Sequence, residues 1–332
     1  MSLSVEQIIR PEEGGKIVTL AGGVGGAKLA SGLYRHLKSQ KRANQLAVVV
    51  NTGDDMDYLG LHISPDLDTV MYTLAGIANP NTGWGIAGDT ANALQMLGDY
   101  GHDNWFWLGD RDIGTHLKRT DLLRQGLTLT RVTSELSKAL GIECQILPMT
   151  DQPVRTIVQT AEAGELAFQE YFVRRRAADT VTGLSFQGIE EATVPDEICQ
   201  AFCDPSLIII CPSNPYLSIA PILAVPGMRE VIRTCTCPIV VVSPIVGGEA
   251  LKGPAAAIMR SLGGEEEASA LAVAKIYAGF AQRFVLDEVD AAQQAEIEEL
   301  AYKTLVTNTI MKTDEDKIRL AAQILESFIP NK

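Results

Sequence analysis

Positive charge is scarce in this sequence of 332 residues. It has 28 lysines and arginines against 41 aspartates and glutamates, which gives a formal net charge of −13. No basic stripe is evident that would neutralise a phosphate backbone, so we expect no nucleic-acid partner. An anionic small ligand would need local positive groups instead: glycine loops, single lysines or arginines, and a divalent metal.

Long apolar runs are also missing. The start of the chain has no apolar stretch of the signal-peptide type, and no stretch is long enough to cross a bilayer. The six cysteines form no CxxC pair, and several lie in apolar runs such as 208–211, which favours buried free thiols in a reducing compartment. These absences predict a cytoplasmic protein without a membrane partner.

The most informative segment that is present runs from Lys16 to Lys28. A short apolar run breaks into glycines and then into a helical pattern; the glycines are Gly22, Gly23, Gly25 and Gly26. A strand, a glycine turn and a helix point backbone N–H groups at an anion, with the positive end of the helix dipole behind them. The spacing matches neither G-x-G-x-x-G nor the P-loop. We therefore expect an unspecified phosphorylated ligand held with Lys28; a tight structural turn is the alternative.

Short apolar runs alternate with helical patterns along most of the chain. The runs at 46–50, 206–211 and 238–243 are nearly continuous in apolar residues, as in parallel strands covered on both faces. Helical patterns lie at 66–75, 89–100, 115–124, 130–140, 254–262 and 313–328, the last with Thr313 as its cap. The sequence therefore predicts an α/β fold with a Rossmann-like, doubly wound, mainly parallel sheet and large insertions.

The domain organisation follows from breaks in this rhythm. We expect a flexible extension at 1–15 and a single Rossmann-type domain at 16–332, in preference to two separate domains. Residues 142–195 interrupt the alternation with short β-like pieces at 154–160 and 168–173, and we interpret them as an insertion.

Carboxylates cluster after the second predicted strand, where ligands bind in open α/β sheets. Asn51, Asp54 and Asp55 follow that strand, and Asp66 and Asp68 come one short loop later. Their hard oxygens suit Mg²⁺, and we predict Asp54, Asp55 and Asp68 as metal ligands. Asp55, Asp66 and Asp68 are the predicted catalytic residues, with the choice of base left open. The alternative is that these aspartates form turns and helix caps.

Three further segments offer contacts to a ligand. Trp107 lies in a tryptophan-rich turn on which a flat ligand would stack, and the alternative is that it packs in the core. The predicted polar contacts are Asp110, Arg111, His116, Ser213, Asn214, Gly247, Gly248 and Lys252. The last three form a second glycine-lysine loop, which strengthens the interpretation of a diphosphate ligand. The basic run at 174–176 is either a solvated face or a contact for an anionic substrate.

Eight motifs together resemble one known family. They are GGVGGAKLA, NTGDD, SPDLDTVMYTLAG, WFWLGDRDIGTH, LPMTDQPVRT, FQEYFVRRR, PSNPYLSI and SPIVGGEALKGP, in this order over nearly the whole chain beyond Gly15. The sequence resembles the 2-phospho-L-lactate transferases (CofD type) of coenzyme F-420 biosynthesis. WFWLGDRDIGTH and PDLDTVMYTLAG carry most of this specificity, because a related branch of nucleotide-sugar-binding morphogenesis and gluconeogenesis factors shares a similar glycine loop.

The resemblance implies a Rossmann-type, Mg²⁺-dependent transferase (EC 2.7.8 type) that acts as a homodimer. The acceptor would be Fo, a deazaflavin with a ribityl tail, and the donor a guanosine diphosphate joined through its distal phosphate to a three-carbon acid. The terminal ribityl hydroxyl would attack that phosphorus, and GMP would leave. Met71, Trp84 and Trp107 would line the ring, while Lys28 and Lys252 would hold the GMP phosphate. The sequence leaves open whether the three-carbon unit is lactyl, enolpyruvyl or glyceryl.

Two other functions stay open on the sequence. One is a non-enzymatic, nucleotide-sugar-binding regulator of the related branch, which has no need of the tryptophan-rich segment at 105–116. The other is a nicotinamide-dependent oxidoreductase. That class needs an acidic residue at the end of the second strand to bind the ribose, whereas here the strand runs directly into Asn51, Thr52 and Gly53.

Overall fold

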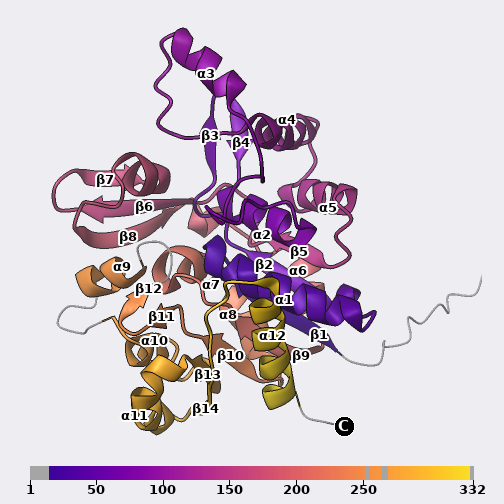
Figure 1. The fold of residues 1–332 in the computed structure, drawn as a ribbon, viewed down its shortest axis with the longest axis vertical. Coiled ribbons are helices and arrows are strands. Elements are labelled where there is room, and N and C mark those ends of the chain that lie inside the picture. The colour runs from indigo at the N-terminus through magenta and orange to yellow at the C-terminus, as the bar shows by residue number, and fades with distance from the viewer. Residues whose placement is uncertain (1–14, 251–254, 263–267, 330–332) are drawn as a thin grey trace, which may run out of the picture.

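A seven-stranded parallel sheet forms the centre of the molecule (Figure 1). The computed structural model describes residues 15–250, 255–262 and 268–329, so nearly all of the predicted extension at 1–15 lies outside the described residues. The strands of this sheet are β1 (Lys16–Ala21), β2 (Leu46–Val50), β5 (Gln145–Pro148), β9 (Pro205–Ile210), β10 (Ile239–Val242), β13 (Arg283–Leu286) and β14 (Lys303–Val306).

The strand order is β14-β13-β10-β9-β1-β2-β5. The chain first builds the sheet outward from β1 through β2 to β5, and then returns to the other side of β1 with β9. The order therefore reverses between β1 and β9, which is the switch point of a doubly wound sheet. The predicted α/β, Rossmann-like fold class is confirmed.

Apolar side chains explain why these segments lie at the centre. β1 pairs with β2 and β9 so that Val18 lies opposite Ala47 on one side and Ile208 on the other. All three residues are fully buried. Strands covered on both faces need continuous apolar sequence, and the runs at 46–50, 206–211 and 238–243 supply it.

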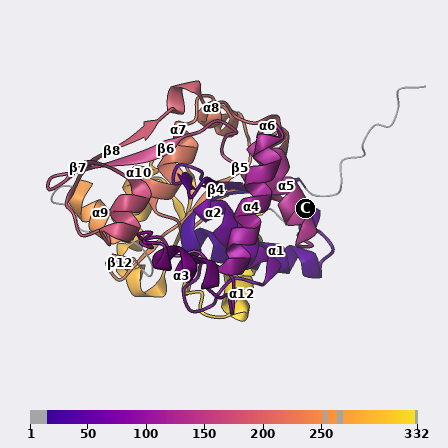
Figure 2. The same cartoon turned by 90° about the horizontal axis from the view of Figure 1, so that it is seen from above.

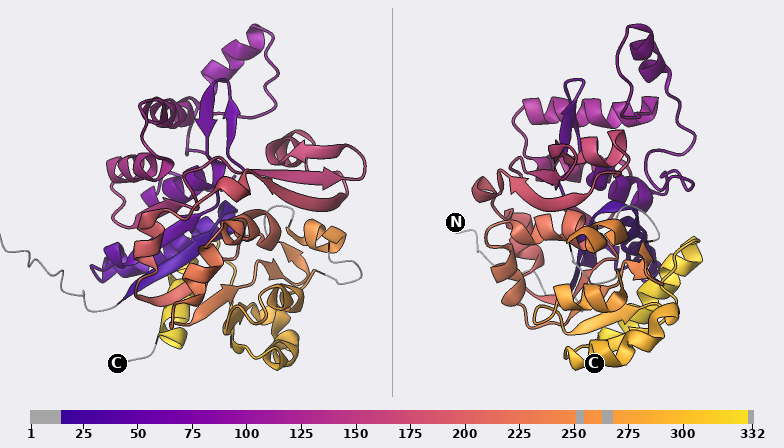
Figure 3. Two further views of the ribbon diagram at one scale, coloured as in Figure 1. Left: turned by 180° about the vertical axis from the view of Figure 1, so that it is seen from behind. Right: turned by 90° about the vertical axis from the view of Figure 1, so that its left-hand side faces the viewer.

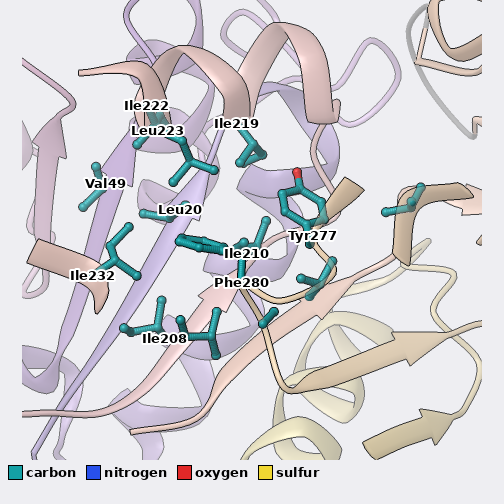
Figure 4. Close-up of a cluster of buried hydrophobic side chains, with 14 of the residues drawn as sticks. Leu20, Val49, Ile208, Ile210, Ile219, Ile222, Leu223, Ile232, Tyr277 and Phe280 are labelled. Carbon is teal, nitrogen blue, oxygen red and sulfur yellow. The ribbon is translucent and has the colours of Figure 1, made fainter. Parts of the chain in front are cut away.

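Helices cover both faces of the sheet. On one face α1 (Gly23–Ser39), α2 (Pro65–Ala75) and α12 (Asp314–Phe328) pack against alternate residues of β1, β2 and β9 (Figure 1). The other face carries α6 (Asp196–Ala201), α7 (Ala220–Ala224), α8 (Met228–Arg233) and α10 (Ala270–Ile276). Figure 4 shows the core on this side, where Leu20 and Ile210 of the sheet meet Ile219, Ile222 and Phe280.

Two groups of elements rise above the carboxyl ends of the strands (Figures 1 and 3). One is an arm that contains the hairpin β3 (Met56–Tyr58) and β4 (Leu61–Ile63), with α3 (Asn92–Asp99), α4 (Asp110–Arg124) and α5 (Leu129–Ala139). The other is an antiparallel sheet of β7 (Gly164–Ala167), β6 (Arg155–Thr160) and β8 (Val181–Gln187), which the view from above shows beside the arm (Figure 2). The predicted insertion at 142–195 contains this sheet, but its first residues form β5 of the central sheet.

The remaining described elements are short. They are α9 (Ala255–Leu262), α11 (Gln294–Glu299), β11 (Ile245–Val246), β12 (Glu249–Ala250), the 3₁₀ turns Ala43–Gln45, Ile189–Glu191 and Glu288–Gln293, and the π-helical turns Glu170–Arg174 and Pro215–Ile219. The β-like piece predicted at 168–173 is wrong, because most of it lies in the first of these π turns. Its content of aromatic residues and Val173 resembled a strand, but Phe168, Tyr171 and Phe172 pack within the insertion instead.

Helix boundaries follow their capping residues. Thr313 caps α12 as predicted: its hydroxyl accepts from the N–H of Asp316 at 3.2 Å, and the Asp316 carboxylate accepts from the N–H of Thr313 at 2.9 Å. α4 begins at Asp110, five residues before the predicted start at 115. The Asp89 carboxylate accounts for the earlier start, because it accepts from the N–H groups of Arg111 and Asp112 at 2.9 and 3.1 Å. No described helix is long and apolar enough to cross a membrane.

Candidate active site at the switch point

A cavity of about 820 Å³ lies at the carboxyl ends of β1 and β9. Three kinds of wall enclose it: the glycine turn that starts α1, a floor of buried carboxylates, and rings from the arm and the insertion. The predicted site residues that line it are Gly22, Gly23, Gly25, Lys28, Asp54, Asp66, Asp68, Trp107, His116, Ser213 and Asn214. The switch point of an open α/β sheet is where ligands bind, and the volume suits a nucleotide-sized ligand.

The glycine turn is fitted tightly against the loop that follows β9. The N–H of Gly22 donates to the Ser213 hydroxyl at 3.1 Å, and that hydroxyl donates to the Gly22 carbonyl at 2.8 Å. A Cβ on Gly25 would lie 2.3 Å from the Pro212 carbonyl oxygen, and one on Gly26 would lie 2.4 Å from the Ser213 hydroxyl. Close packing therefore requires these glycines, and Gly26 is buried beneath the cavity rather than lining it.

Gly23 connects the turn to the carboxylates. Its φ of +62° lies in the left-handed region that favours glycine, and its N–H donates to the Asp66 carboxylate at 2.6 Å. The first two N–H groups of the turn are thus used within the protein. Val24 and Gly25 follow in the first turn of α1 and line the cavity, so the positive end of the helix dipole faces it.

Asn51 joins Asp54 and Asp66 into what we call the bridged pair. Its side-chain amide donates to the Asp54 carboxylate at 2.5 Å and to the Asp66 carboxylate at 3.0 Å. Its own oxygen accepts from the N–H of Gly53 at 2.8 Å, which fixes the orientation of the amide. Asn51 itself does not line the cavity; it holds two carboxylates that do.

Burial sets the charge state of the bridged pair. It raises the pKa of Asp54 well above its usual range, and the charges of Asp66 and Asp55 raise it further. Burial also raises the pKa of Asp66 to about 6, although hydrogen bonds from Asn51 and Gly23 oppose the change. Two carboxylates close together and out of water repel each other, so a cation or a proton between them is favoured.

Asp55 lies behind this pair and does not line the cavity. Its carboxylate accepts from the Ser64 hydroxyl at 2.8 Å and lies 3.2 Å from the His62 ring nitrogen. Burial raises the pKa of Asp55, and the hydrogen bonds from His62 and Ser64 oppose that rise. Its second oxygen, Oδ1, is buried and has no partner. Asp55 thus has no contact with the cavity, and its predicted roles in catalysis and metal binding stay predictions.

A second acidic group, which we call the arginine network, joins α2 to α4. Arg119 is 1% exposed and binds both oxygens of Asp68 with its two terminal nitrogens. The same guanidinium lies 3.2 Å from Nδ1 of His116, whose Nε2 is 3.4 Å from the Asp112 carboxylate. Tyr72 donates to Asp112 at 2.6 Å. Asp68, the predicted metal ligand, thus has a fixed cationic partner.

The charges within the arginine network compensate one another. Burial opposes the charge of Arg119, but Asp68 outweighs it and raises the pKa of the guanidinium. Burial likewise opposes the charge of Asp112, but the hydrogen bond and charge of His116 lower its pKa. Asp68, Asp112 and His116 place ligand atoms within 4.8 Å of one another, which is compatible with a metal. Arg119 and Asp112 were missed from the sequence, although positions 112, 116 and 119 share one helix face.

Aromatic rings form the outer walls of the cavity. Trp84 and Trp107 meet edge to face with ring centroids 5.8 Å apart, and each is partly exposed. Phe168 and Phe172, on and beside the π turn Glu170–Arg174, stack at 5.5 Å with a 10° angle between their planes. The insertion thus supplies a second aromatic wall that the strand interpretation of 168–173 did not reveal. Gln169, which follows Phe168 in the sequence, is buried, and its side-chain amide donates to the backbone carbonyl of Asp54 at 3.3 Å.

Arg174 ties the two walls together. Its guanidinium pairs with Asp103 at 2.8 Å and lies over the Trp105 ring, 5.9 Å from the centroid. Arg175 binds the Asp179 carboxylate with two nitrogens, each at 2.6 Å. Neither arginine lines the cavity: Arg174 joins the insertion to the arm, and Arg175 pairs within the insertion.

Two predicted cavity contacts are used partly by the protein itself. The Lys28 ammonium donates to the Met311 carbonyl at 2.9 Å, and both residues line the cavity. The Asn214 side-chain oxygen caps the turn after β9 by accepting from the N–H groups of Tyr216 and Leu217. Its amide nitrogen is buried and has no hydrogen-bond partner within the described residues.

The structure does not bring five other predicted contacts to the cavity walls. Met71 is 2% exposed in the core between α2 and the sheet, because its position on α2 faces inward. Asp110 caps α3 by accepting from the N–H groups of Asn92 and Ala93. The hydrogen bond from the Thr90 hydroxyl, together with these bonds, lowers the pKa of Asp110. The others are Arg111, Gly247 and Gly248, of which Gly247 donates to Asp290. Lys252 lies outside the described residues.

The fold and cavity define a Rossmann-type protein with a large cavity at the switch point of its sheet. The family model described as 2-phospho-L-lactate transferase CofD matches residues 17–326. A 2-phospho-L-lactate transferase of Methanosarcina mazei is 37% identical over 312 residues, which are 94% of this chain and 100% of that protein. A phosphoenolpyruvate transferase of Streptomyces griseus is 38% identical over 316 residues, 94% and 98% of the two chains.

A solved structure of a UPF0052-family protein from Bacillus halodurans has a TM-score of 0.61 and covers 95% of this chain and 99% of its own. At 15% identity that likeness shows the fold alone. The sequence matches decide the family: the chain belongs to the CofD family of transferases. This membership favours the enzyme over the regulator and the oxidoreductase that the sequence left open.

Proposed function

We propose that the protein transfers a phospho-three-carbon-acid unit, of the phospholactyl or phosphoenolpyruvyl type, from a guanosine-diphosphate-linked donor to the terminal ribityl hydroxyl of Fo. This step of coenzyme F-420 biosynthesis releases GMP. The names of the relatives support both donor types, since those of Streptomyces griseus and Mycobacterium avium are phosphoenolpyruvate transferases. The observation that carries the proposal is one cavity that unites a helix N-terminus, buried carboxylates and aromatic walls.

The donor diphosphate fits the glycine turn. Val24 and Gly25 at the start of α1 and the ammonium of Lys28 supply positive potential at one end of the cavity. The unpartnered amide nitrogen of Asn214 lies in the same wall and can donate to a phosphate oxygen. In a chain of net charge −13, these groups concentrate the local attraction that an anionic donor needs.

The acceptor ring fits the aromatic walls. A deazaflavin is flat and largely apolar, and Trp84, Trp107, Phe168 and Phe172 all line the cavity. Stacking of a base on one such side chain contributes roughly 1–3 kcal/mol. The walls also exclude water from the reacting phosphorus, which strengthens the electrostatic interactions around it.

The bridged pair fits Mg²⁺ better than the arginine network does. Asp54 and Asp66 are buried carboxylates without a guanidinium between them, whereas Arg119 already neutralises Asp68. Mg²⁺ takes oxygen ligands, commonly one or two carboxylates together with substrate phosphates. When bound, it would neutralise the charge of the donor diphosphate.

The residues themselves align the reactants. Asn51 and Gly23 hold the two carboxylates in fixed positions, and the turn holds the diphosphate, so the ribityl hydroxyl meets the distal phosphorus in line. The bond from the hydroxyl oxygen to phosphorus forms while the bond to the GMP oxygen breaks. The hydroxyl proton passes to the carboxylate of the bridged pair that does not bind the cation, because Asn51 and Gly23 hold that pair at the cavity wall.

The test is to incubate purified protein with Fo and, separately, the lactyl, enolpyruvyl and glyceryl guanylated donors. Mass spectrometry of the products should show one adduct of Fo together with an equal amount of GMP. Absence of every adduct at saturating Fo and Mg²⁺ would contradict the proposed function. The homodimer implied by the resemblance is checked in parallel by light scattering on the same preparation.

A further inference from the structure

Three cysteines lie together at the end of the sheet opposite the cavity. Cys203 comes two residues before β9 begins at Pro205, and Cys235 and Cys237 come shortly before β10 begins at Ile239. The cavity is at the carboxyl ends of the strands, so this thiol group is remote from it. Nothing in the proposed reaction uses these side chains.

The separation of two of the thiol residues is tightly bounded. The Cys235 thiol donates to the Phe202 carbonyl oxygen at 3.4 Å. That oxygen belongs to the peptide that links Phe202 to Cys203, and it lies about 2.8 Å from the next Cα across a trans peptide. The Cys235 sulfur is therefore at most about 6 Å from the Cα of Cys203. This bound runs from a sulfur to a Cα and makes the two residues close neighbours. A disulfide requires their Cα atoms to be about 4.4–6.8 Å apart, and oxidation of the pair tests whether the chain reaches that separation.

The two thiols differ in exposure. Cys203 is exposed and its sulfur donates to the Cys199 carbonyl at 3.3 Å, whereas Cys235 is half-buried against the core. Burial, and then the neighbouring Cys203, raise the pKa of Cys235. Cys203 is thus the thiol that meets a reagent from solution, and Cys235 is the one placed to react with it afterwards.

A preformed metal cage does not explain the group. Within the described ranges, the only three potential ligand atoms that lie within 4.8 Å of one another come from Asp68, Asp112 and His116. Cys203, Cys235 and Cys237 do not form such a set among the described residues. Pairing, and not metal binding, is the chemistry that this geometry favours.

We propose that Cys203 and Cys235 form an intramolecular disulfide when the chain meets a low-molecular-weight disulfide. The Cys203 thiolate attacks one sulfur of the reagent and releases the first small thiol, and the Cys235 thiolate then attacks the mixed disulfide and releases the second. Two protein thiols and one small disulfide thus become one protein disulfide and two small thiols. The protein pair is oxidised and the reagent is reduced.

The bond would close a loop around one supersecondary unit. Residues 203–235 contain β9, the Pro212–Asn214 wall of the cavity, α7 and α8. Cross-linking a loop of this length removes conformational freedom from the unfolded chain and stabilises the fold. We expect the melting temperature to rise by about 3 °C or more.

The experiment treats the full-length protein with oxidised glutathione, blocks remaining thiols and maps linked peptides by mass spectrometry. We expect a peptide pair joined through Cys203 and Cys235, a loss of two free thiols per chain, the rise in melting temperature, and reversal by dithiothreitol. Cys203→Ser should abolish all of these changes. Cys199→Ser is the matched control and should keep them.

Three results would overturn the proposal. The first is a link from Cys203 to Cys237 in place of Cys235, and the second is a link between two chains. The third is a glutathione adduct that stays on Cys203 without closing onto Cys235. None of these outcomes depends on transferase activity, so the proposal and the proposed function fail or stand separately.

Discussion

Two groups of buried carboxylates face the same cavity, and they differ in how their charge is balanced. In the arginine network the guanidinium of Arg119 binds Asp68 with two nitrogens. In the bridged pair only the neutral amide of Asn51 lies between Asp54 and Asp66. In the first group the charge of Asp68 is already balanced by Arg119 within the fold. The second keeps charge that only a ligand, a cation or a proton can balance, and we therefore assign function to it.

The same contrast separates stability from chemistry. A buried ion pair is strongly destabilised when one partner is removed, because the other charge stays out of water. An uncompensated pair of carboxylates already costs stability, and such a cost persists where it serves a site. If this contrast holds, substitutions in the arginine network lower stability, whereas substitutions in the bridged pair lower activity.

The largest expected effect is on the arginine network. Arg119→Met keeps the volume but leaves Asp68 buried and unpaired beside Asp112, and we expect a loss of about 3–5 kcal/mol in the free energy of unfolding. Denaturant titration measures it. The matched control is Arg124→Met, an exposed position of the same helix, where a change below about 1 kcal/mol is expected. An equally small loss of stability for both variants would contradict the stabilising role of the arginine network.

The bridged pair should show the opposite pattern. Asp54→Asn preserves an oxygen for Asn51 but removes charge from the cavity, and we expect turnover to fall on the order of 100-fold or more. The melting temperature should stay the same or rise. Asp68→Asn should instead lower the melting temperature by several degrees, because Arg119 loses its counter-charge. Turnover assays and thermal melts of both variants give the comparison. A large loss of melting temperature in Asp54→Asn, with turnover lost only in Asp68→Asn, would contradict it.

The aromatic walls test acceptor binding without touching either acidic group. Trp107→Ala should raise the dissociation constant of Fo by about tenfold, since loss of one stacking contact costs roughly 1–3 kcal/mol. Phe172→Ala should act in the same direction if the ring lies between the two walls. Titration of Fo fluorescence measures both. Wild-type affinity in a folded Trp107 variant would mean that this ring is ordinary packing.

The smallest expected effect is a pH dependence of stability. The raised pKa values of Asp54 and Asp66 mean that the folded chain holds these protons more tightly than the unfolded chain. The contribution of Asp66 to stability therefore falls as pH rises from about 4 through about 6, and that of Asp54 continues to fall until pH passes its own raised pKa. Asp54→Asn removes one of these buried carboxylates and its penalty. The melting temperature of the variant minus that of the wild type should therefore increase by a few degrees between pH 4.5 and 8.

This pH series is measured with a chelator present, so that no divalent cation binds. Asp99→Asn, at an exposed position on α3, is the control and should show no such trend. A gain for Asp54→Asn that shrinks as pH rises would have the wrong sign for a buried, uncompensated carboxylate.

The sequence predicted β1, β2, β9 and β10 because these central strands are rich in apolar residues, but it did not predict β5, β13 or β14, which are short and begin with polar residues. It predicted the glycine turn and the carboxylates near it because both follow strand ends. It could not show that Asp68 is paired. Arg119 lies 51 residues from Asp68, and only the fold of the arm, which places α4 beside α2, brings them together. Phe168 and Phe172 were missed for a similar reason: a π turn has no clear signal in a single sequence, and aromatic and β-branched residues such as these also favour strands.

The most direct test of the division is calorimetric titration of Mg²⁺ into the wild type, Asp54→Asn and Asp112→Asn. Each variant removes one carboxylate and keeps an oxygen at the same position. We predict that Asp54→Asn loses Mg²⁺ binding, while Asp112→Asn binds it within about threefold of wild type. Loss of binding in Asp112→Asn with retention in Asp54→Asn would place the metal in the arginine network and contradict the account.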